Sequence, residues 1–190
     1  LAACHGKSEC ITALHHLCGD ILDVNIVDND NNTALMLAVI NNNVNCILSL
    51  EKCFRDKIDV NICNTNKYSA LSLAVHLGYP ICISTLYKCF ANTLKYDLLD
   101  HNGHNLLLLA VLSDKPNALR MLHTLYGDKL DVNFTDGDNN TILLITAQKN
   151  LVHCLTALCS CYREKLQFDN VDENNNNILM IAVQKNFTNY

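Results

Sequence analysis

The stretch Asp28–Asn43, DNDNNTALMLAVINNN, decides how the chain folds, because a short apolar block lies between two flanks that are rich in Asn. Such flanks are either low-complexity, disordered filler or turns that the backbone requires. The composition favours turns. The chain has 190 residues, of which 49% are hydrophobic and only 17% are charged, which is typical of a folded domain with a sizeable core.

The apolar block recurs with a period of 36 residues and without insertions. The block NTALMLAV at Asn32 aligns with YSALSLAV at Tyr68, HNLLLLAV at His104, NTILLITA at Asn140 and NNILMIAV at Asn176. A second marker, DVN, occurs in the same register at Asp23, Asp59 and Asp131. A fixed period of this length indicates a repeat architecture.

Each repeat predicts two helices separated by a tight turn. A residue that tolerates a left-handed backbone follows each apolar block, as expected where a helix ends. These residues are Asn42, Gly78, Asp114, Asn150 and Asn186, preceded in the same register by Gly6. Two residues later the chain has Val or Pro, and proline suits the first turn of a helix. Apolar residues spaced three and four apart predict the buried face of this second helix. They are Ile47, Leu50, Phe54 and Ile58 in one repeat and Ile83, Leu86, Phe90 and Leu94 in the next.

A polar tip rich in Asp, Asn and Gly follows each DVN marker or its equivalent and predicts a hairpin-like turn. One position in this tip requires a positive φ, and four repeats place Asn31, Gly103, Asn139 or Asn175 there. Lys67 breaks this residue pattern in the remaining repeat. The Asn residues are therefore interpreted as turn and cap residues that recur because the fold recurs.

Helix, tight turn, helix and hairpin loop is the order of the ankyrin unit, and the sequence resembles the ankyrin repeat family over its whole length. The family order D…G-x-T-P-L-H-x-A, then G, then V-x-x-L-L is visible in DNDNNTALMLAVINNNVNCILSL. No repeat has the proline of T-P-L-H, and Met36, Ser72, Leu108, Leu144 or Met180 replaces the His. The period is also longer than the usual 33 or so residues. The extra length falls in EKCFRDKI and HTLYGDKL, so the second helix or its following loop should be longer than usual.

The resemblance implies an all-α ankyrin-repeat solenoid of about five helix-turn-helix units joined by hairpin-like loops. We expect residues 1–190 to form a single domain. Its units should span about 1–22 (partial), 23–58, 59–94, 95–130, 131–166 and 167–190 (partial). Neither end carries the polar capping repeat that a solenoid needs, so the chain is expected to be an excerpt of a larger protein.

The eleven cysteines follow the repeat register, which favours structural thiols over disulfides or a zinc site. Cys10, Cys46, Cys82 and Cys154 share one position of the second helix, and Cys53, Cys89 and Cys161 share another. Leu or Ala fills these positions elsewhere, as expected for a small buried hydrophobic residue. Cys159, Cys161, His153 and Cys154 form the densest group, but their spacing is not that of a zinc finger. Reduced thiols indicate the cytoplasm or the nucleus.

Several function classes are disfavoured. The net charge of −5 argues against binding nucleic acid or an anionic membrane, and the longest apolar run, Leu106–Leu112, is too short to span a bilayer. The first residues of the sequence are not expected to act as a signal peptide. Paired carboxylates such as Asp136 and Asp138 are explained as solvated turn residues, and no phosphate loop or catalytic triad spacing occurs. We expect no catalysis within these residues, no cofactor, no metal and no small-molecule substrate.

The resemblance implies that a partner protein binds the concave face built from hairpin tips and first helices. The family positions transferred to this sequence include Tyr68, His76, Leu77, His101, His104 and Leu112 from the middle repeats, and Asp30 and Asp138 from the outer ones. Interface energy concentrates in central aromatic or apolar residues with a polar rim. We therefore predict docking over the middle repeats. The alternative is that Leu77 and Leu112 are partly buried by neighbouring repeats and that Tyr68 is a lone exposed ring.

Six acidic tip residues favour a partner with a basic rim: Asp28, Asp30, Asp100, Asp136, Asp138 and Asp172. The leading hypothesis is a non-catalytic protein-binding module. One alternative is a regulatory or targeting segment of a larger enzyme or ion channel. Another is an inhibitor of a Rel-type transcription factor, a role that similar acidic ankyrin arrays perform.

Overall fold

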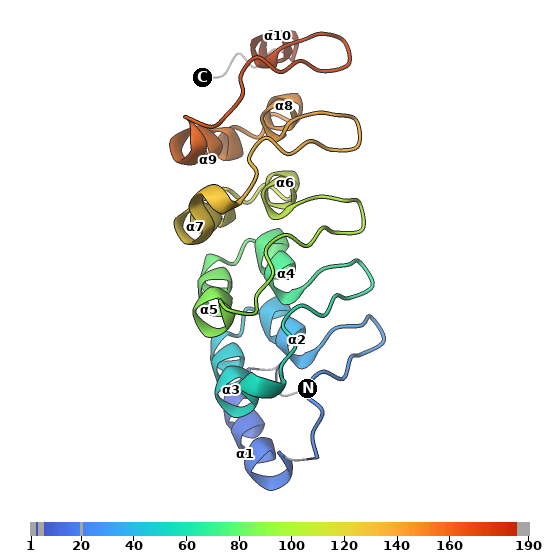
Figure 1. Cartoon of the computed structure of the whole chain (residues 1–190), viewed down its shortest axis with the longest axis vertical. Helices are drawn as coiled ribbons and strands as arrows, with labels where there is room; N and C mark the ends of the chain where they lie inside the picture. Colours follow the sequence, from blue (N-terminus) through green and yellow to red (C-terminus); the bar gives the residue numbers. More distant parts are fainter. Residues whose placement is uncertain (1–2, 4–5, 20, 186–190) are drawn as a thin grey trace.

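The computed structural model describes residues 3, 6–19 and 21–185, which form one stack of short helices (Figure 1). The first helices of the repeats are α2 (Ala34–Ile40), α4 (Ala70–Leu77), α6 (Leu106–Leu112), α8 (Ile142–Gln148) and α10 (Ile178–Gln184). The second helices are α1 (Ser8–Cys18), α3 (Val44–Phe54), α5 (Pro80–Phe90), α7 (Pro116–Tyr126) and α9 (Val152–Tyr162). The described residues contain no strand, only isolated bridges at hairpin bases. The predicted all-α solenoid is confirmed.

The two helix sets form two columns, and the hairpin loops project beyond the column of first helices (Figure 1). Each helix packs against its partner in the repeat or against the equivalent helix of the next repeat. One continuous core runs from Ala3 to Leu166, and a smaller cluster around Leu144, Ala147 and Ile181 joins α8 to α10. No helix of the described residues has the length and apolarity to cross a membrane.

A side-chain cap begins every first helix. Thr33, Ser69, Asn105, Thr141 and Asn177 each accept a hydrogen bond from the backbone N–H three residues further on. This bond satisfies one of the N–H groups that a helix start leaves without a partner. Helices of seven or eight residues are too short to be stable alone, so packing of their buried faces must hold them.

The turn between the two helices has the predicted left-handed residue. Asn42, Gly78, Asp114 and Asn150 have φ of 53°, 75°, 52° and 56°, and Gly6 has φ of 67°. Asn186, which was expected to continue this series, lies outside the described residues. The second helices begin at Val44, Pro80, Pro116 and Val152, as predicted.

The predicted end of the second helix is wrong. The helices α3 and α5 end at Phe54 and Phe90, so Ile58 and Leu94 lie in the loops that follow rather than on the helix face. Leu94 is nevertheless buried in the core, and Ile58 packs against it. The extra residues of the long period therefore lie in the loop, where short 3-10 turns at Arg55–Lys57 and Gly127–Lys129 accommodate them.

The Asn of the DVN marker links one repeat to the next. The side-chain amide of Asn25 donates to the carbonyl oxygen of Lys57 at 2.7 Å, and its oxygen accepts from the N–H of Asp59 at 2.9 Å. Asn61 and Asn133 make the equivalent pairs of bonds one and three repeats further on. In the third junction along the chain Asp97 occupies this position, and its side chain makes no hydrogen bond among the described residues.

The cysteines of the first repeated position mostly behave as buried structural groups. Burial raises the pKa of Cys82 to about 11 and that of Cys154 to about 12. Their thiols donate to the side-chain oxygens of Asn42 and Asp114, the left-handed turn residues of the preceding repeats. Cys10 is a correction to the predicted burial. It is exposed, because α1 is the first described helix of the stack and packs mainly against α3.

The cysteines of the second repeated position are half-buried rather than fully buried. None of the ten described cysteines is part of a disulfide, and no group of three or more His, Cys, Asp or Glu side chains suited to a metal ion occurs in the described part of the chain.

Candidate protein-binding surface

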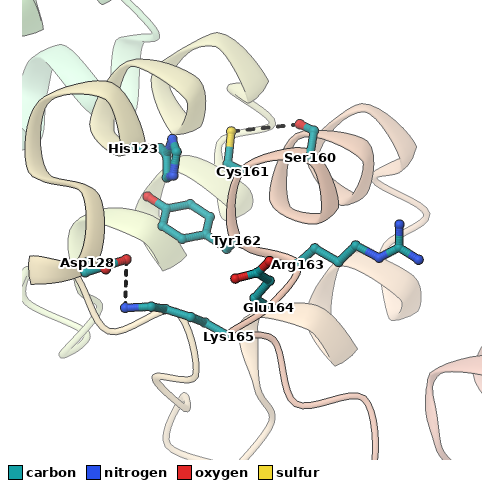
Figure 2. Close-up of a pocket in the computed structure, with 8 residues that line it drawn as sticks. All are labelled: His123, Asp128, Ser160, Cys161, Tyr162, Arg163, Glu164 and Lys165. Carbon is teal, nitrogen blue, oxygen red and sulfur yellow. Dashed lines mark hydrogen bonds and ion pairs between the residues drawn. The ribbon is translucent and has the colours of Figure 1, made fainter.

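Two groups of polar and titratable side chains are the main candidates for a site, and the first lies where α7 and α9 end (Figure 2). It is a cavity of about 380 Å³ lined by His123, Asp128, Ser160, Cys161, Tyr162, Arg163, Glu164 and Lys165. Lys165 pairs with Asp128 at 2.7 Å. The His123 ring packs edge-on against Tyr162, at 4.8 Å between centroids, instead of lying beside a nucleophile. The Ser160 hydroxyl donates to the carbonyl oxygen of Ala157. This arrangement offers no activated nucleophile.

The hairpin tips form the second group of polar side chains. In each tip, one side chain accepts two backbone hydrogen bonds that close the turn. A carboxylate oxygen of Asp28 accepts from the N–H groups of Asp30 and Asn32, at 2.9 and 2.8 Å. Asn64, Asp100, Asp136 and Asp172 accept the equivalent bonds in the other repeats. The bonds from the backbone of Asn32 and Asn176 lower the pKa values of Asp28 and Asp172 respectively. These carboxylates are thus parts of the turns.

The predicted left-handed tip position is confirmed at Asn31, Gly103, Asn139 and Asn175, whose φ values run from 60° to 79°. Lys67 has φ of 57°, so its backbone adopts the same left-handed conformation even though its residue type differs from Asn and Gly. The turn imposes this conformation because Asn64 closes the tip as its Asp equivalents do, and the N–H of Lys67 donates to the carbonyl oxygen of Asn64 at 2.9 Å.

Of the six acidic tip residues, four close turns, and Asp100 is 95% buried. Asp30 and Asp138 remain, and both are exposed and contribute only their main chains to the tip hydrogen bonds. They lie on the first and fourth tips and not beside the middle residues of the predicted site. A basic rim on the partner stays a prediction that rests mainly on these two carboxylates.

Three of the predicted site residues come together in the middle repeats. The rings of Tyr68 and His76 stack at 5.2 Å between centroids, and His101 from the next tip lies edge-on to Tyr68 at 6.5 Å. Burial, followed by the nearby charge of Asp100, raises the pKa of the Tyr68 phenol. Tyr68 is therefore not the lone exposed ring of the alternative interpretation.

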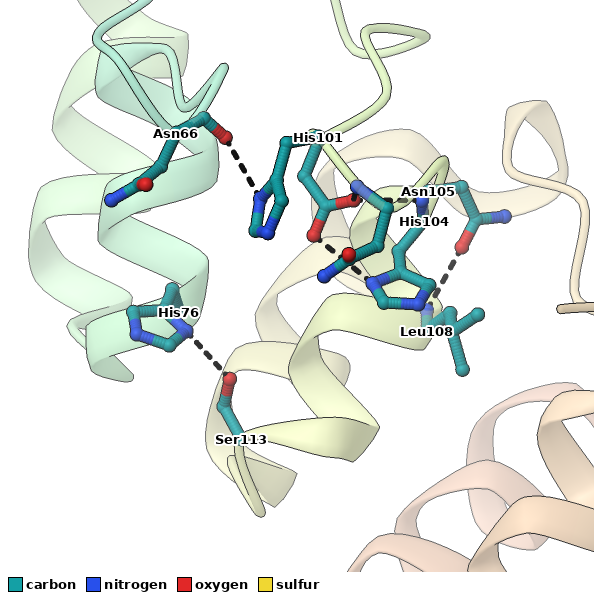
Figure 3. Close-up of polar contacts among 9 residues, drawn as sticks. Asn66, His76, His101, His104, Asn105, Leu108 and Ser113 are labelled. Carbon is teal, nitrogen blue, oxygen red and sulfur yellow. Dashed lines mark hydrogen bonds and ion pairs between the residues drawn. The ribbon is translucent and has the colours of Figure 1, made fainter. Parts of the chain in front are cut away.

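We define the central cluster as Tyr68, His76 and His101. Hydrogen bonds orient the imidazoles of His76 and His101 (Figure 3). Nδ1 of His76 lies 2.8 Å from the hydroxyl oxygen of Ser113 on the next repeat, and Nδ1 of His101 lies 3.3 Å from the carbonyl oxygen of Asn66. Each contact crosses a junction between repeats. The cluster thus presents its rings in a fixed arrangement that spans two repeats.

The other predicted site residues of the middle repeats have side chains that are hydrogen-bonded or partly buried within the chain. His104 is tied to the buried carboxylate of Asp100, 3.0 Å from its Nδ1 (Figure 3). Leu112 is half-buried against the core, and Leu77 is half-buried as well. The alternative prediction of partial burial therefore fits these two leucines, which border the surface.

A feature that the sequence reasoning missed is a pair of amide contacts in the last repeats. The amide of Gln148 donates to the side-chain oxygen of Asn140 at 3.3 Å, and that of Gln184 donates to Asn176 at 3.0 Å. These pairs occupy the same two repeat positions as Tyr68 and His76. In the sequence, the constant separation of eight residues between the two positions was the signal that could have indicated these contacts.

Known proteins share this architecture. The family model described as "Ankyrin repeats (3 copies)" matches residues 1–97. The crystal structure of EF0377, an ankyrin repeat protein, aligns with a TM-score of 0.79 and 19% identity, over 98% of this chain and 90% of that chain. The structure of Bd0816, a predatory endopeptidase from Bdellovibrio bacteriovorus in complex with the immunity protein Bd3460, includes a chain that aligns with a TM-score of 0.73 and 18% identity, over 98% of this chain and 91% of that chain. No curated protein matches. At these identities the structural neighbours show the fold alone.

Proposed function

The chain belongs to the ankyrin repeat family, and we propose that it is a non-catalytic module that binds a protein partner on its inner surface. We define the inner surface as the five hairpin tips together with the last turns of the first helices. The partner docks over the middle repeats. It is a protein, as in the neighbouring structure of an endopeptidase with an immunity protein, whose title names two proteins in complex.

The observation that supports this proposal most is the central cluster. Three aromatic side chains from two repeats lie together on one surface, and Ser113 and the backbone of Asn66 orient the two imidazoles. Preorganised aromatic groups at the centre of a surface are the usual energetic anchors of protein interfaces. Rings also meet on or beside the second helices, at Tyr87, Tyr96 and Tyr126 and at His15, His16 and Phe54, but each of these groups includes a buried core ring, Tyr126 or Phe54.

The partner carries Lys or Arg around its contact surface. The chain has a net charge of −5, and Asp30 and Asp138 are exposed on either side of the central cluster along the stack. Charges at an interface rim act mainly on the association rate and make it dependent on ionic strength. The free thiols, several with raised pKa values, suit a reducing compartment such as the cytoplasm or the nucleus.

Site-directed photo-cross-linking tests this function. A photoreactive phenylalanine analogue replaces Tyr68 in one variant and Ile81, which is 63% exposed on α5, in a matched control. After irradiation in an extract of the native cell, we expect the Tyr68 probe to trap a discrete protein that the Ile81 probe does not. Equal trapping at both positions, or trapping at neither, would contradict the proposed surface.

A further inference from the structure

Each repeat places two side chains, separated by eight residues, at the same positions of the inner surface. One comes from the base of the tip and the other from the last turn of the first helix. The five pairs are Asn32 with Ile40, Tyr68 with His76, His104 with Leu112, Asn140 with Gln148, and Asn176 with Gln184. We call these ten residues the inner strip. All except the buried Asn32 are at least partly exposed.

The inner strip changes character along the stack. In the second and third repeats the pairs carry aromatic or apolar groups: the stacked rings of Tyr68 and His76, then His104 and Leu112. In the fourth and fifth repeats both pairs are Asn with Gln, and each is joined by a hydrogen bond from the Gln amide. One half of the strip thus suits apolar or planar side chains, and the other suits amide-like groups.

The amide half matches the main chain of an extended segment. The side-chain oxygens of Gln148 and Gln184 accept no hydrogen bond among the described residues, and each Gln amide retains a second N–H. A free acceptor and a free donor on one side chain complement a peptide group. A helix has few free peptide groups because it bonds them internally, whereas an extended chain leaves them available.

The repeat spacing sets the register. Neighbouring first helices pack directly against each other, and packed helices lie about 8 to 10 Å apart. A polyproline II segment, which is extended and has three residues per turn, advances about 3.1 Å per residue, so residues three apart lie on one face and about 9 Å apart. Residues three apart in such a ligand therefore meet equivalent pairs of successive repeats.

We infer that the inner strip binds a segment of the partner protein in the extended polyproline II conformation, at three residues per repeat. Two anchor side chains, three residues apart, lie over the Tyr68–His76 and His104–Leu112 pairs, and Gln148 and Gln184 hydrogen-bond the main chain further along. The anchors are aromatic or aliphatic, because they contact stacked rings and Leu112. This inference rests on the proposed function and adds the conformation and the register of the ligand.

Selection from a library of random peptides of about 12 residues, long enough to pass four repeats at about 3.1 Å per residue, tests the register. The whole chain is the bait, and an excess of the Tyr68→Asn, His76→Gln double variant is the competitor that removes peptides bound elsewhere. We expect the enriched peptides to share two apolar or aromatic residues at positions i and i+3. Anchors spaced by seven, as on one face of a helix, or no common spacing would overturn the inference.

Variants that replace the pairs of the second and third repeats by Asn and Gln test whether these pairs hold the anchor side chains of the ligand. Tyr68→Asn with His76→Gln, and separately His104→Asn with Leu112→Gln, install the pair that the same fold carries at Asn140 and Gln148. Each change should lower the affinity for a selected peptide by about tenfold or more, the usual effect of losing an anchor. Ile81→Gln is the matched control and should leave affinity unchanged. Thermal unfolding of each variant shows that the fold is retained.

The main-chain contacts have their own test. N-methylation of the peptide at the residue opposite Gln148 should lower affinity several-fold, as expected for a lost hydrogen bond. In the Gln148→Ala variant the same methylation should have no further effect. Additive losses would overturn the role of Gln148. If the double variants reduce binding but the peptides show no three-residue spacing, the extended register is wrong and the protein-binding function stands. If no variant of the inner strip changes binding, both are wrong.

Discussion

Individual residues at two recurring positions of this chain adopt left-handed backbone conformations, and the residue types at those positions reflect this. Asn, Asp and Gly fill nine of the ten described residues at these two positions, and Lys67 is the exception with φ of 57°. Such a conformation costs a residue with a Cβ atom about 1 to 2 kcal/mol, while Gly adopts it freely. The backbone conformation therefore explains the Asn residues at these positions.

Replacing Lys67 by Gly should relieve this cost. We expect Lys67→Gly to raise the free energy of unfolding by about 0.5 to 1 kcal/mol, because part of the gain is offset by the greater entropy of Gly in the unfolded chain. Urea denaturation measures the change. The reverse replacement, Gly103→Lys, should lower stability at the equivalent position. A loss of stability in Lys67→Gly would mean that the Lys side chain makes a stabilising contact.

The phenol of Tyr126 is buried, and its oxygen has no hydrogen-bond partner among the residues that the structure describes. Burial raises the pKa of this group. Phe54 and Phe90 occupy the equivalent position in earlier repeats. Tyr126→Phe should therefore stabilise the protein by about 1 kcal/mol, since it removes a polar atom that burial deprives of water. Chemical denaturation checks this value, with Tyr96→Phe as a control expected to change stability by less than about 0.5 kcal/mol. A destabilised Tyr126→Phe variant would contradict the unsatisfied hydroxyl.

At the scale of elements, the sequence predicts the starts of helices better than their ends. The starts have local chemical markers, namely the caps of the first helices and the Val or Pro that opens the second helices. The end of the second helix has no such marker, and Ile58 and Leu94 continue the apolar spacing beyond it. Hydrophobic periodicity reports burial, and a loop residue can be buried in phase with the helix before it. The predicted helix face was too long for this reason.

The hairpin tip predicts a dependence on pH. The backbone N–H of Asn32 holds the pKa of Asp28 below its ordinary value of 3.8. A lowered folded-state pKa means that the ionised turn stabilises the fold above that ordinary value, and the contribution is lost as pH falls through the lowered value. Asp28→Asn, which copies Asn64 of the next tip, should leave stability near neutral pH little changed and reduce its loss in acid. Denaturation at pH values on both sides of 3.8 measures this. An unchanged pH profile would contradict the role of Asp28.

At the scale of the whole molecule, stability is a sum of repeats and of the junctions between them. Asn25, Asn61 and Asn133 strengthen three junctions through two hydrogen bonds each, and Asp97 leaves the remaining one without them. A carboxylate lacks the N–H that donates to the carbonyl oxygen of the next repeat. The junction after Asp97 is therefore the weakest by this measure.

Asp97→Asn should supply the missing donor toward the carbonyl of Lys129. We expect the free energy of unfolding to rise by about 1 kcal/mol, the typical net value of a hydrogen bond. The exchange of amide hydrogens in α6 and α7 should slow, because opening at this junction becomes rarer. Asn61→Asp is the reciprocal control and should destabilise the chain. Equal stability of Asp97→Asn and the original chain would show that the other contacts already secure this junction.

The sequence identified Tyr68, His76 and His101 as surface residues because they occupy fixed repeat positions. It could not show that their rings touch, since the contacts join side chains of two repeats and depend on rotamers. The bond between His76 and Ser113 spans 37 residues and has no local signature. For the same reason the charge pattern overstated the acidity of the tips, because Asp28, Asp100, Asp136 and Asp172 serve the turns. Composition counts charges but does not show which are already hydrogen-bonded.

Amide hydrogen exchange of the chain, with and without the partner trapped at Tyr68, tests the central claim most directly. The account predicts slower exchange on binding at the tips 64–68 and 100–104 and at the ends of α4 and α6, with α3, α5 and α7 unchanged. Slower exchange concentrated on the second helices, with the central cluster unaffected, would contradict it.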